Sequence, residues 1–368
     1  MNAESFPLID LAGTPHARGR AYGAAVPERI ARSVALYRGQ MQRRGVEQAE
    51  QFRLARGFMP TIEAYDPTYL EEMRGIAEGA GVALEDIVII NCRTEMMFGY
   101  ETLGKAETKR EPDDGCTGII VLPEAAREGR LIHAHNWDWR EECIDTGVVL
   151  RIRNEHAPDI LVFAEAGALA RHGFNSAGVS ITGNFLMCER DYQKPGEAPL
   201  ALLRRKLLEM PNLAGALGQV FTKSRLCSNN LMLGHADGEA VDLECAPDEV
   251  FWMTPEDGVL VHANHWISPI ARVKLTDLGI RNNSDSIYRQ RRVAAVLQAK
   301  RGGISIDDIK AALFDEFGKP DSVLRSPKPV SFESISATVA TTIMDTAARK
   351  MWIARAPYLN RVFAEYTL

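Results

Sequence analysis

The sequence lacks the features of three large classes of protein. Its 43 lysine and arginine residues are outnumbered by 49 aspartate and glutamate residues, and the net charge of −6 offers no basic face for the phosphates of nucleic acid. No apolar run approaches the roughly 20 residues that span a bilayer, so we expect no contact with a membrane. The six cysteines show no CxxC spacing, which favours free thiols over a disulfide framework.

Signals for export are also missing. The first residues, MNAESFPLIDLAG, contain neither a basic n-region nor an apolar h-region, so we expect no secretory signal and a cytoplasmic location. Short basic clusters do occur, such as Arg204-Arg205-Lys206. Because this cluster lies among acidic and apolar residues, it predicts a solvent-exposed helix face and not a binding surface.

The first part of the chain carries helical patterns. Hydrophobic residues make up 46% of the 368 residues, enough for a packed core in one large domain or two ordinary ones. Apolar residues recur at helical spacing over residues 27–41, 69–81 and 84–97. Residues 101–115 are polar and marked by proline and glycine, so they predict an exposed loop.

The pattern changes to short strands after Cys116. Apolar runs separated by turn residues predict strands over 117–123, 130–139, 148–155, 159–167 and 173–185. The close spacing of these runs favours antiparallel hairpins, because a parallel crossover needs a dozen or more residues.

The remainder mixes helices and hairpins. Helical patterns cover residues 197–210, 212–223, 286–300 and 305–318, the last with Ser305 as its N-cap. Two hairpins are expected, over 230–253 with a turn at Asp237-Gly238 and over 335–355. Helices before, between and after groups of strands predict an α+β layered fold.

Cys116 stands between a polar loop and an apolar run, in the stretch EPDDGCTGII. A thiol is nucleophilic but mostly protonated at neutral pH, so it needs a base. Cleavage of the Gly115–Cys116 bond would supply one, because the new α-amino group has a pKa of about 8. The pattern meets both requirements of this arrangement, which are an accessible loop before the cysteine and a buried strand after it.

A second group of candidates is HAHNWDW, residues 133–139. On a strand His133 and His135 share a face, so with Asp138 they could bind one metal ion, as in metal-dependent amidohydrolases. Those enzymes use a (β/α)₈ barrel, whereas this chain shows hairpins. The other interpretation places both histidines in a polar layer of the sheet.

Asparagines form a third group, since a buried side-chain amide can donate to a developing oxyanion. Each of them could equally be a turn residue. The candidates are Asn136, Asn175, Asn184, Asn229, Asn230 and Asn264.

Several stretches together resemble one known family. They are LAGTPHARGRAYG (11–23), EMRGIAEGAGVALEDIVIINCRTE (72–95), DGCTG (114–118), HNWDW (135–139), GFNSAGVSITGNF (173–185), SNNLMLGHADGEAVDLE (228–244), HANHW (262–266) and SATVATTIMD (336–345). In this order, over nearly the whole chain, they are similar to the acyl-CoA:6-aminopenicillanic acid acyltransferase family. These proteins are the C45 cysteine peptidases among the N-terminal nucleophile (Ntn) hydrolases.

The resemblance implies a four-layer αββα sandwich, with two antiparallel sheets between helix layers, and synthesis as an inactive precursor. Self-cleavage between Gly115 and Cys116 would give an α chain, 1–115, and a β chain, 116–368. The two chains would stay associated as one structural domain. The mature protein would cleave a linear amide through a thioester on Cys116 without a cofactor or a metal.

The resemblance also assigns roles to individual residues. Cys116 matches the nucleophile, and its α-amine is the expected base. Asp138 matches the carboxylate that orients that amine, and Asn230 matches the amide that donates to the oxyanion. By similarity to choloylglycine hydrolases, the backbone N–H groups around Asn184 and Phe185 are expected to supply a second donor.

Two departures from the related patterns bear on the substrate. The penicillin-processing member pairs its carboxylate with a late arginine, but Ile335 aligns at that place, leaving Arg349 and Arg355 as the next candidates downstream. Choloylglycine hydrolases carry an arginine soon after the cysteine, which CTGIIVLP lacks, so we do not expect a bile-salt hydrolase. We expect hydrolysis of an N-acyl amine or a small peptide-like amide, with transfer of the acyl group to a second amine as the other outcome.

Two other functions remain open. One is a metal-dependent amidohydrolase that uses His133 and His135, and the other is a binding relative that keeps the fold but never cleaves itself. The expected partners are a small-molecule amide and the two chains of one precursor. The sequence leaves association into a homo-oligomer open.

Overall fold

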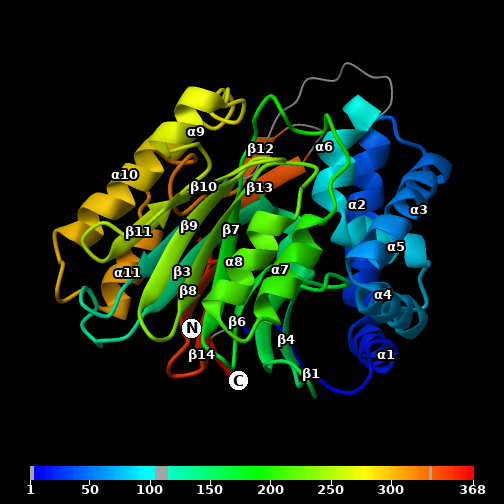
Figure 1. Cartoon of the computed structure of the whole chain (residues 1–368), viewed down its shortest axis with the longest axis horizontal. Coiled ribbons are helices and arrows are strands. Elements are labelled where there is room, and N and C mark those ends of the chain that lie inside the picture. Colours follow the sequence, from blue (N-terminus) through cyan, green and yellow to red (C-terminus); the bar gives the residue numbers. More distant parts are fainter. Residues whose placement is uncertain (1–3, 104–114, 331–333) are drawn as a thin grey trace.

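The computed structural model describes residues 4–103, 115–330 and 334–368. Two β-sheets lie face to face in the middle of the molecule, with helices on their outer sides (Figure 1). Strands β2 (Gly115–Val121) and β3 (Ile132–Arg140) of one sheet pack against β7 (Val179–Phe185) of the other. The four layers confirm the expected αββα sandwich.

The first sheet has eight strands in the order β1-β4-β5-β6-β7-β8-β9-β10. Besides β7, these are β1 (Leu8–Leu11), β4 (Gly147–Ile152), β5 (Ile160–Glu165), β6 (His172–Asn175), β8 (Asn229–His235), β9 (Glu239–Cys245) and β10 (Val250–Met253). All neighbours are antiparallel except β1 and β4, which run parallel. The sheet is antiparallel as expected except at this edge, where β1, a strand distant in sequence, joins β4 in parallel.

The second sheet has the order β11-β2-β3-β13-β14-β15, and β12 also pairs with β13. Its further strands are β11 (Val259–His262), β12 (Lys328–Val330), β13 (Ser334–Asp345), β14 (Lys350–Arg355) and β15 (Ala364–Thr367). Every pair in it is antiparallel. Strand β2, which begins at the expected processing site, thus lies inside the sheet between β3 and β11.

The N-terminal helices gather on the right of Figure 1 and cover the first sheet near β4 and β5. They are α1 (Pro15–Ala25), α2 (Pro27–Arg43), α3 (Gln48–Tyr65), α4 (Pro67–Ala80), α5 (Leu84–Asn91) and α6 (Arg93–Leu103). Tyr22 of α1 donates to the backbone oxygen of Glu165 at 3.2 Å, and Arg29 of α2 donates to that of Gly147 at 3.3 Å. These contacts fix the helices to the sheet.

The single helix expected over 84–97 is two helices. Cys92 leaves the helical conformation, with φ −113° and ψ 22°, between α5 and α6. The side chain of Asn91 donates to the backbone oxygen of Gly167 and accepts from the backbone N–H of Leu169, each at 2.9 Å. These two bonds to a distant turn accompany the break between the helices. The apolar pattern along the chain cannot show such contacts.

The remaining helices cover both outer sides. Helices α7 (Leu200–Leu208) and α8 (Leu213–Thr222) lie on β6, β7 and β8 of the first sheet. Helices α10 (Asp285–Gln298) and α11 (Ile306–Leu313) lie on β2, β3 and β11, and α9 (Pro269–Lys274) precedes them. A capping box between Ser305 and Asp308 begins α11, which confirms the expected N-cap.

Some sequence expectations are corrected. Residues 230–253 form three strands, β8 to β10, because a second reversal follows the expected turn at Asp237-Gly238. Arg205 of the cluster that predicted a solvated face is fully buried, where it forms ion pairs with Glu72 and Glu209. Of the loop expected over 101–115, residues 101–103 belong to α6 and residues 104–114 lie outside the described residues.

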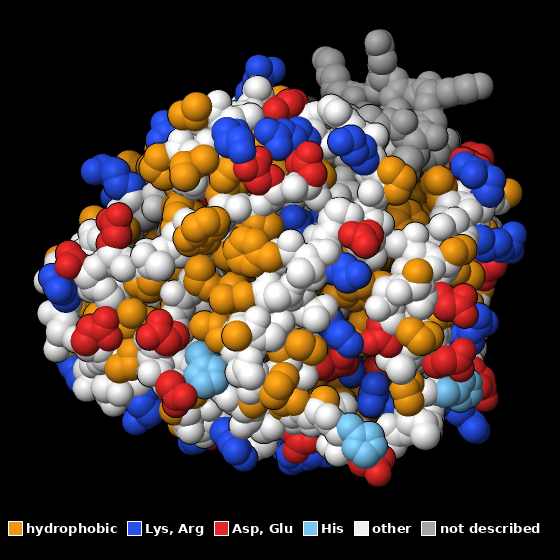
Figure 2. All heavy atoms as spheres, viewed as in Figure 1, with side chains coloured by type: hydrophobic (Ala, Val, Ile, Leu, Met, Phe, Trp, Pro, Cys, Tyr) orange, Lys and Arg blue, Asp and Glu red, His pale blue; other side chains and the backbone are white. Residues whose placement is uncertain are grey.

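The surface agrees with the charge balance of the sequence. Acidic and basic side chains are interspersed over the face seen in Figure 2, without a broad area of one sign. Within the residues that the structure describes, no helix is long and apolar enough to cross a bilayer.

Candidate active site

Cys116 is the second residue of β2, and its side chain is fully buried. In the ladder between β2 and β3, Gly115 lies opposite Asp138 and Cys116 lies opposite Trp137. Successive residues on a strand point to opposite faces. Trp137 packs on Phe163 of the other sheet, with ring centroids 5.7 Å apart, so its neighbour Asp138 points toward the helix layer.

The thiol of Cys116 has a cation beside it. Arg171, which directly precedes β6 in the other sheet, places Nη2 at 3.6 Å from the Cys116 Sγ atom. The guanidinium also stacks on Trp137, with its carbon 4.0 Å from the ring centroid. A positive charge at this distance favours the thiolate, which is the nucleophilic form of cysteine.

The backbone nitrogen of Cys116 has its own acceptor. The Oδ1 atom of Asn264 accepts the Cys116 N–H at 2.7 Å. Asn264 is held in turn by a bond from its Nδ2 to the backbone oxygen of Phe185, at 3.1 Å, and by a bond from its N–H to the Ser286 hydroxyl, at 2.6 Å. The nitrogen that cleavage would turn into an α-amine is therefore already positioned.

The carbonyl group of Cys116 is held by an arginine. Arg289 of α10, which is fully buried, donates through Nη1 to the Cys116 oxygen at 2.8 Å and to the Thr117 hydroxyl at 3.1 Å. Its Nη2 donates to Asn264 at 3.1 Å, and its Nε donates to Asp285 at 2.7 Å. Thiol, nitrogen and carbonyl of Cys116 thus contact three different side chains.

Asp138 lies on β3 opposite Gly115, next to the bond between Gly115 and Cys116. It accepts from the Thr338 hydroxyl at 2.6 Å, and Arg325 Nε lies 3.3 Å from its Oδ2 atom. Arg325 also donates to Asp285 at 2.5 Å. Burial alone would raise the pKa of Asp285, but Arg289 and Arg325 outweigh it and the pKa is lowered. A chain of alternating charges therefore runs from Asp138 through Arg325, Asp285 and Arg289 to the carbonyl oxygen of Cys116.

The arginine that the structure places beside Asp138 is Arg325, which the sequence analysis did not name. Ile335, which aligns with the family's late arginine, is 41% exposed on β13. Arg355 pairs with Glu4 and Asp145, and Arg349 lies in the turn between β13 and β14. The arginine on Asp138 comes instead from the loop before β12, where no regular pattern marks it.

The expected oxyanion residues lie together in the first sheet. Asn184 Nδ2 donates to Asn230 Oδ1 at 3.1 Å and to the backbone oxygen of His262 at 3.0 Å. Asn230 Nδ2 donates to the Asp242 carboxylate and, at 3.5 Å, to the backbone oxygen of Leu243. A side chain added at Gly118 would come within 3.7 Å of Asn184 Nδ2, so Asn184 faces β2 two residues beyond Cys116. Phe185 joins the site through its oxygen, which Asn264 holds.

A buried charge cluster supports these asparagines. His262 Nε2 lies 2.9 Å from Glu244 and 3.9 Å from Asp242. Burial would lower the pKa of His262, but the two carboxylates raise it to about 9. Burial raises the pKa of Asp242 to about 6. A protonated His262 thus compensates acidic charge next to Asn184 and Asn230.

The metal-site candidates have other partners. The ring nitrogens of His133 lie 2.9 Å from the Ser180 hydroxyl and 2.8 Å from the Thr182 hydroxyl, and His135 Nε2 lies 3.0 Å from Asn184 Oδ1. Burial lowers the pKa of His133 to about 3. Across the described ranges, no three histidine, cysteine or acidic side chains are grouped to hold a metal ion. The two histidines form a polar layer between the sheets, and Asp138 faces the other way.

The other cysteines have structural positions. All six cysteines lie in the described part of the chain, all are buried, and none forms a disulfide. Cys143 contacts Tyr37 and Glu165, and Cys188 contacts Asp191 and Ser228. Only Cys116 stands at the start of a strand behind a glycine.

Sequence reasoning missed four charged residues, among those that the structure describes, that touch Cys116 or Asp138 directly or through one neighbour. These are Arg171, Asp285, Arg289 and Arg325. Asp285 and Arg289 are four residues apart on α10, a spacing that typically marks a surface ion pair. Asn264 was one of the asparagine candidates, and it lies in the HANHW stretch that resembles the family.

Comparisons with known proteins identify the family of the chain. The model of the family described as acyl-coenzyme A:6-aminopenicillanic acid acyl-transferase matches residues 125–357. A relative from Emericella nidulans, described as acyl-coenzyme A:6-aminopenicillanic-acid-acyltransferase 40 kDa form, is 30% identical over 257 residues, which are 69% of this chain and 67% of the relative. The range matched by the family model begins after Cys116.

Two solved structures were compared with the chain, and the first of them shares its fold. Conjugated bile acid hydrolase from Clostridium perfringens superposes with a TM-score of 0.50 at 14% identity, over 69% of this chain and 92% of that protein. Penicillin V acylase from Agrobacterium tumefaciens has a TM-score of 0.44 at 16% identity, over 66% of this chain and 83% of that protein. With the fold of an Ntn hydrolase and a family match over more than half of its length, the chain belongs to the acyl-coenzyme A:6-aminopenicillanic acid acyl-transferase family.

Proposed function

We propose that the chain is a self-processing amidohydrolase that cleaves a linear amide through a thioester on Cys116. The observation that carries the proposal is the separate contact made to each part of Cys116: Arg171 at the thiol, Asn264 at the nitrogen and Arg289 at the carbonyl oxygen. A cysteine that only filled space in a strand would need none of these polar and charged partners.

Maturation would begin with attack of the Cys116 Sγ atom on the carbonyl carbon of Gly115. The bond from Gly115 to the Cys116 nitrogen breaks, the thiol proton passes to that nitrogen, and a thioester forms. Water then cleaves the thioester into a Gly115 carboxylate and a free thiol. The products are an α chain, 1–115, and a β chain, 116–368.

The two chains would stay together because they share buried contacts. Arg93 of α6 pairs with Glu165 of β5 at 2.9 Å, and Gln40 of α2 donates to Ser334 of β13 at 2.5 Å. Buried ion pairs and hydrogen bonds of this kind are costly to break, since each leaves an unpaired polar group.

Turnover would use the new α-amine as the base. The amine takes the proton of the thiol, Sγ attacks the carbonyl carbon of the substrate amide, and the proton passes to the leaving amine. Asp138, with Arg325 and Thr338, would orient the amine from behind. The Asn230 amide and the backbone N–H groups around Asn184 and Phe185 are the candidates for donors to the oxyanion. Water would then hydrolyse the thioester and regenerate the enzyme.

No cofactor takes part in these steps. We expect water as the acceptor of the acyl group, because the features specific to β-lactam acyl transfer were not found in the sequence. Transfer to a second amine would share every step up to the thioester. The cytoplasmic location and association into homo-oligomers stay predictions from the sequence.

Denaturing mass spectrometry tests the proposal. We expect the wild-type chain to give two fragments, the second beginning with Cys116, and the Cys116→Ala variant to give one uncut chain. Cys245→Ala, which removes another buried strand cysteine, is the matched control and should be cut normally. An uncut wild type with amidase activity that chelators abolish would favour the metal-dependent alternative, and an uncut, inactive wild type would favour the binding relative.

A further inference from the structure

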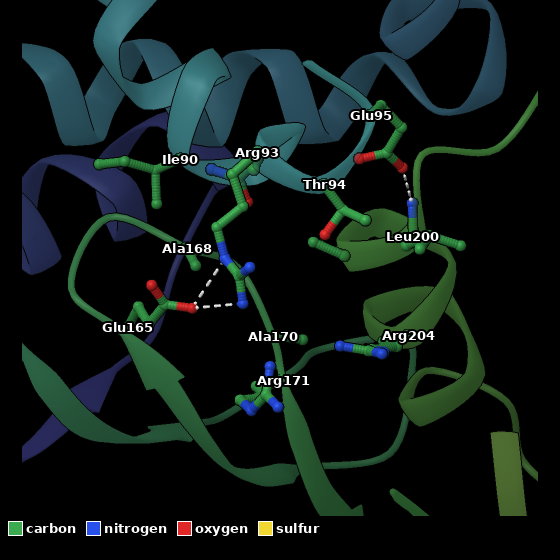
Figure 3. A pocket seen from close by; sticks show the side chains of 12 residues that line it. Ile90, Arg93, Thr94, Glu95, Glu165, Ala168, Ala170, Arg171, Leu200 and Arg204 are labelled. Carbon is green, nitrogen blue, oxygen red and sulfur yellow. Dashed lines mark hydrogen bonds and ion pairs between the residues drawn. The ribbon is translucent and has the colours of Figure 1, made fainter. Parts of the chain in front are cut away.

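A small cavity lies between α6, α7 and the start of β6 (Figure 3). It consists of two adjoining spaces, which share the side chains of Arg93, Thr94, Arg171 and Arg204 in their walls. They offer about 30 and about 20 Å³ to the centre of a water molecule. About 10–15 Å³ is enough for one water, so a group of a few atoms fits here but a whole substrate does not.

A side-chain amide without a partner lines this cavity. Asn229, the first residue of β8, is 1% exposed, and among the described residues neither its nitrogen nor its oxygen has a hydrogen-bond partner. Buried polar side chains are nearly always paired, because an unpaired donor or acceptor retains the cost of its desolvation. The Asn229 amide is therefore available to a ligand through both its donor and its acceptor.

The next residue along the strand is paired on both sides of its amide. Asn230 Nδ2 donates to the Asp242 carboxylate, and Asn230 Oδ1 accepts from Asn184 Nδ2 at 3.1 Å. Successive residues on a strand point to opposite faces, so Asn229 points away from this cluster. Of the two neighbouring amides, one is used within the fold and the other is left for a ligand.

The strand ladder connects Asn229 to the reacting nitrogen. Asn229 lies opposite Phe185 in the ladder between β7 and β8, so the two side chains share a face. The Phe185 ring packs on Phe98 of α6, with centroids 5.3 Å apart, which shows that this face looks toward the helices. The backbone oxygen of Phe185 accepts from Asn264, which itself accepts the Cys116 N–H. Asn229 thus lies at the same end of the sandwich as the processing site.

The cavity also adjoins the thiol. Arg171, whose side chain lines both spaces, lies 3.6 Å from the Cys116 Sγ atom. Figure 3 shows Thr94, Arg171 and Arg204 directed toward a common space. The guanidinium of Arg171 therefore touches both the cavity and the thiol. A group bound in the cavity would lie only several atoms from an amide that the thiol attacks.

The backbone that carries Asn229 is held firmly. Ser228, the preceding residue, donates to Asp191 through its N–H at 2.9 Å and through its hydroxyl at 2.5 Å. Asp191 also accepts the backbone N–H of Cys188 at 3.1 Å. Because the amide stands on a fixed strand end, a ligand would lose little entropy in ordering it.

We propose that Asn229 binds a primary carboxamide of the substrate, so that the enzyme selects amides that carry a second, uncleaved CONH₂ group near the scissile bond. A primary carboxamide presents an N–H beside its C=O, and these match the oxygen and nitrogen of the Asn229 amide in two hydrogen bonds. The inference deepens the proposed function and rests on it for the reaction. The carboxamide can stand on the amine side, as in N-acetylglycinamide, or on the acyl side, as in N-methylsuccinamide.

Binding is tested first in the uncut Cys116→Ala chain, so that turnover plays no part. The probes are N-acetylglycinamide and N-methylsuccinamide. Their matches are N-isobutylacetamide and N,4-dimethylpentanamide, in which an isopropyl group replaces the carboxamide. We expect calorimetry to show that at least one carboxamide probe binds roughly 10- to 100-fold more tightly than its match, the ratio expected for two hydrogen bonds. The probe that binds identifies the side that carries the carboxamide.

Asn229→Val in the same background should remove that preference, because valine is apolar, close to asparagine in size and favourable in a strand. Gln51→Ala is the matched control and should keep the preference. Gln51 is a buried amide of α3 that donates to the backbone oxygens of Arg38 at 3.1 Å and Val46 at 2.7 Å. Equal binding of each carboxamide and its match, as expected if a bound water alone satisfies Asn229, would overturn the subsite. A preference that survives Asn229→Val would do the same.

Urea denaturation of the ligand-free, uncut chain gives a measurement that needs no probe. Because the Asn229 amide has no partner within the described fold, Asn229→Val should leave the midpoint of unfolding unchanged or raise it. Gln51→Ala breaks two hydrogen bonds and should lower the midpoint. A lowered midpoint in Asn229→Val would show that this amide supports the fold, and it would contradict the subsite.

Turnover separates the subsite from the proposed function. In the self-processed enzyme, Asn229→Val should raise KM for the carboxamide substrate roughly 10-fold or more and leave kcat/KM for its isopropyl match unchanged. Loss of both activities together in Asn229→Val would contradict a role in substrate selection. A chain that binds the carboxamide through Asn229 but never cuts itself would keep the subsite and sink the proposed amidase. A self-cut amidase that shows no preference for the carboxamide would sink the subsite alone.

Discussion

Asn264 holds the backbone nitrogen of Cys116 through a hydrogen bond of 2.7 Å to its Oδ1 atom. The other end of the amide donates to Phe185 in the opposite sheet, which fixes the direction of the acceptor. If cleavage turns this nitrogen into the catalytic α-amine, Asn264 decides where its N–H bonds point and thereby directs the lone pair toward the thiol. Asn264 is thus a positioning residue for the base.

The first prediction concerns this bond. Asn264→Ala should lower kcat roughly 100-fold, the size of effect that a misplaced reacting group can cause, with little change in KM. An acceptor stabilises the protonated amine, so its removal should lower the pKa of the α-amine and shift the acidic limb of the kcat/KM profile to lower pH.

Asn264→Asp should shift the same limb to higher pH, because a carboxylate stabilises the protonated amine more strongly. Asn154→Ala, in the turn between β4 and β5, serves as the control for loss of an asparagine with local bonds only. A variant at Asn264 that lost rate without any movement of the pH profile would show a purely structural role.

The second prediction separates two arginines. Arg325→Met removes the cation between Asp138 and Asp285 and leaves two buried carboxylates without it. Breaking a buried ion pair costs about 3–5 kcal/mol, so the free energy of unfolding should fall by that order and self-cleavage should slow.

Arg355→Met is the comparison, because Arg355 is the arginine that the alignment suggested. Its partners Glu4 and Asp145 are largely exposed. The free energy of unfolding should therefore fall by about 1 kcal/mol or less, as for surface pairs, and self-cleavage should be normal. Urea denaturation and the fraction cut at fixed times measure both effects. The assignment of Arg325 fails if Arg355→Met is the variant that stops cleavage.

Part of the site could be predicted because it lies in strands. Cys116, Asp138, Asn184 and Asn230 occupy β2, β3, β7 and β8, where short motifs and alternating faces give each side chain a place. The antiparallel hairpins followed from the spacing of the apolar runs, and the two-sheet sandwich followed from the family resemblance.

The rest could not be predicted because it depends on side chains that reach the site from elsewhere. Arg325 comes from a loop, Arg171 from a turn and Arg289 from a helix whose pattern is that of a surface element. The direction of a long charged side chain is set by its tertiary partners, which no local period records. For the same reason Arg205 was expected on the surface and is buried.

The third prediction concerns Gly115, which packs against Arg325. A Cβ atom at Gly115 would come within 2.5 Å of Arg325 Cζ, and that guanidinium is held by Asp138 and Asp285. Gly115→Ala should therefore slow self-cleavage severely and let the precursor accumulate. Gly129→Ala, where an added Cβ meets nothing within 4 Å but φ is +63°, controls for the general cost of replacing a glycine.

In the proposed enzyme residue 115 would end the α chain and take no part in turnover, so the fraction of Gly115→Ala that does mature should show the wild-type kcat. Time courses on denaturing gels, with active sites titrated by a thiol reagent, give both quantities. Cleavage at the wild-type rate would show that the contact with Arg325 does not shape the processing site.

The fourth prediction follows from the charge cluster around His262. Its pKa, about 9 in the folded chain, is raised above the ordinary value of 6.5 by Asp242 and Glu244. A raised pKa means that protonated His262 stabilises the fold fully below pH 6.5, and that this stabilisation is lost as the pH rises to 9. The pKa of Asp242, about 6, places its own titration below this window.

The uncut Cys116→Ala chain should accordingly lose about 3 kcal/mol of unfolding free energy between pH 6.5 and pH 9, from a shift of this size at about 1.4 kcal/mol per pKa unit. His262→Asn should be less stable at pH 6.5, since it leaves the carboxylates without their cation, but its stability should change little across the window. His16→Asn, which removes an exposed histidine beside Glu78, should keep the wild-type slope. Urea titrations at intervals of half a pH unit measure the slopes, and equal slopes for His262→Asn and its parent would rule out the assignment of this charge to His262.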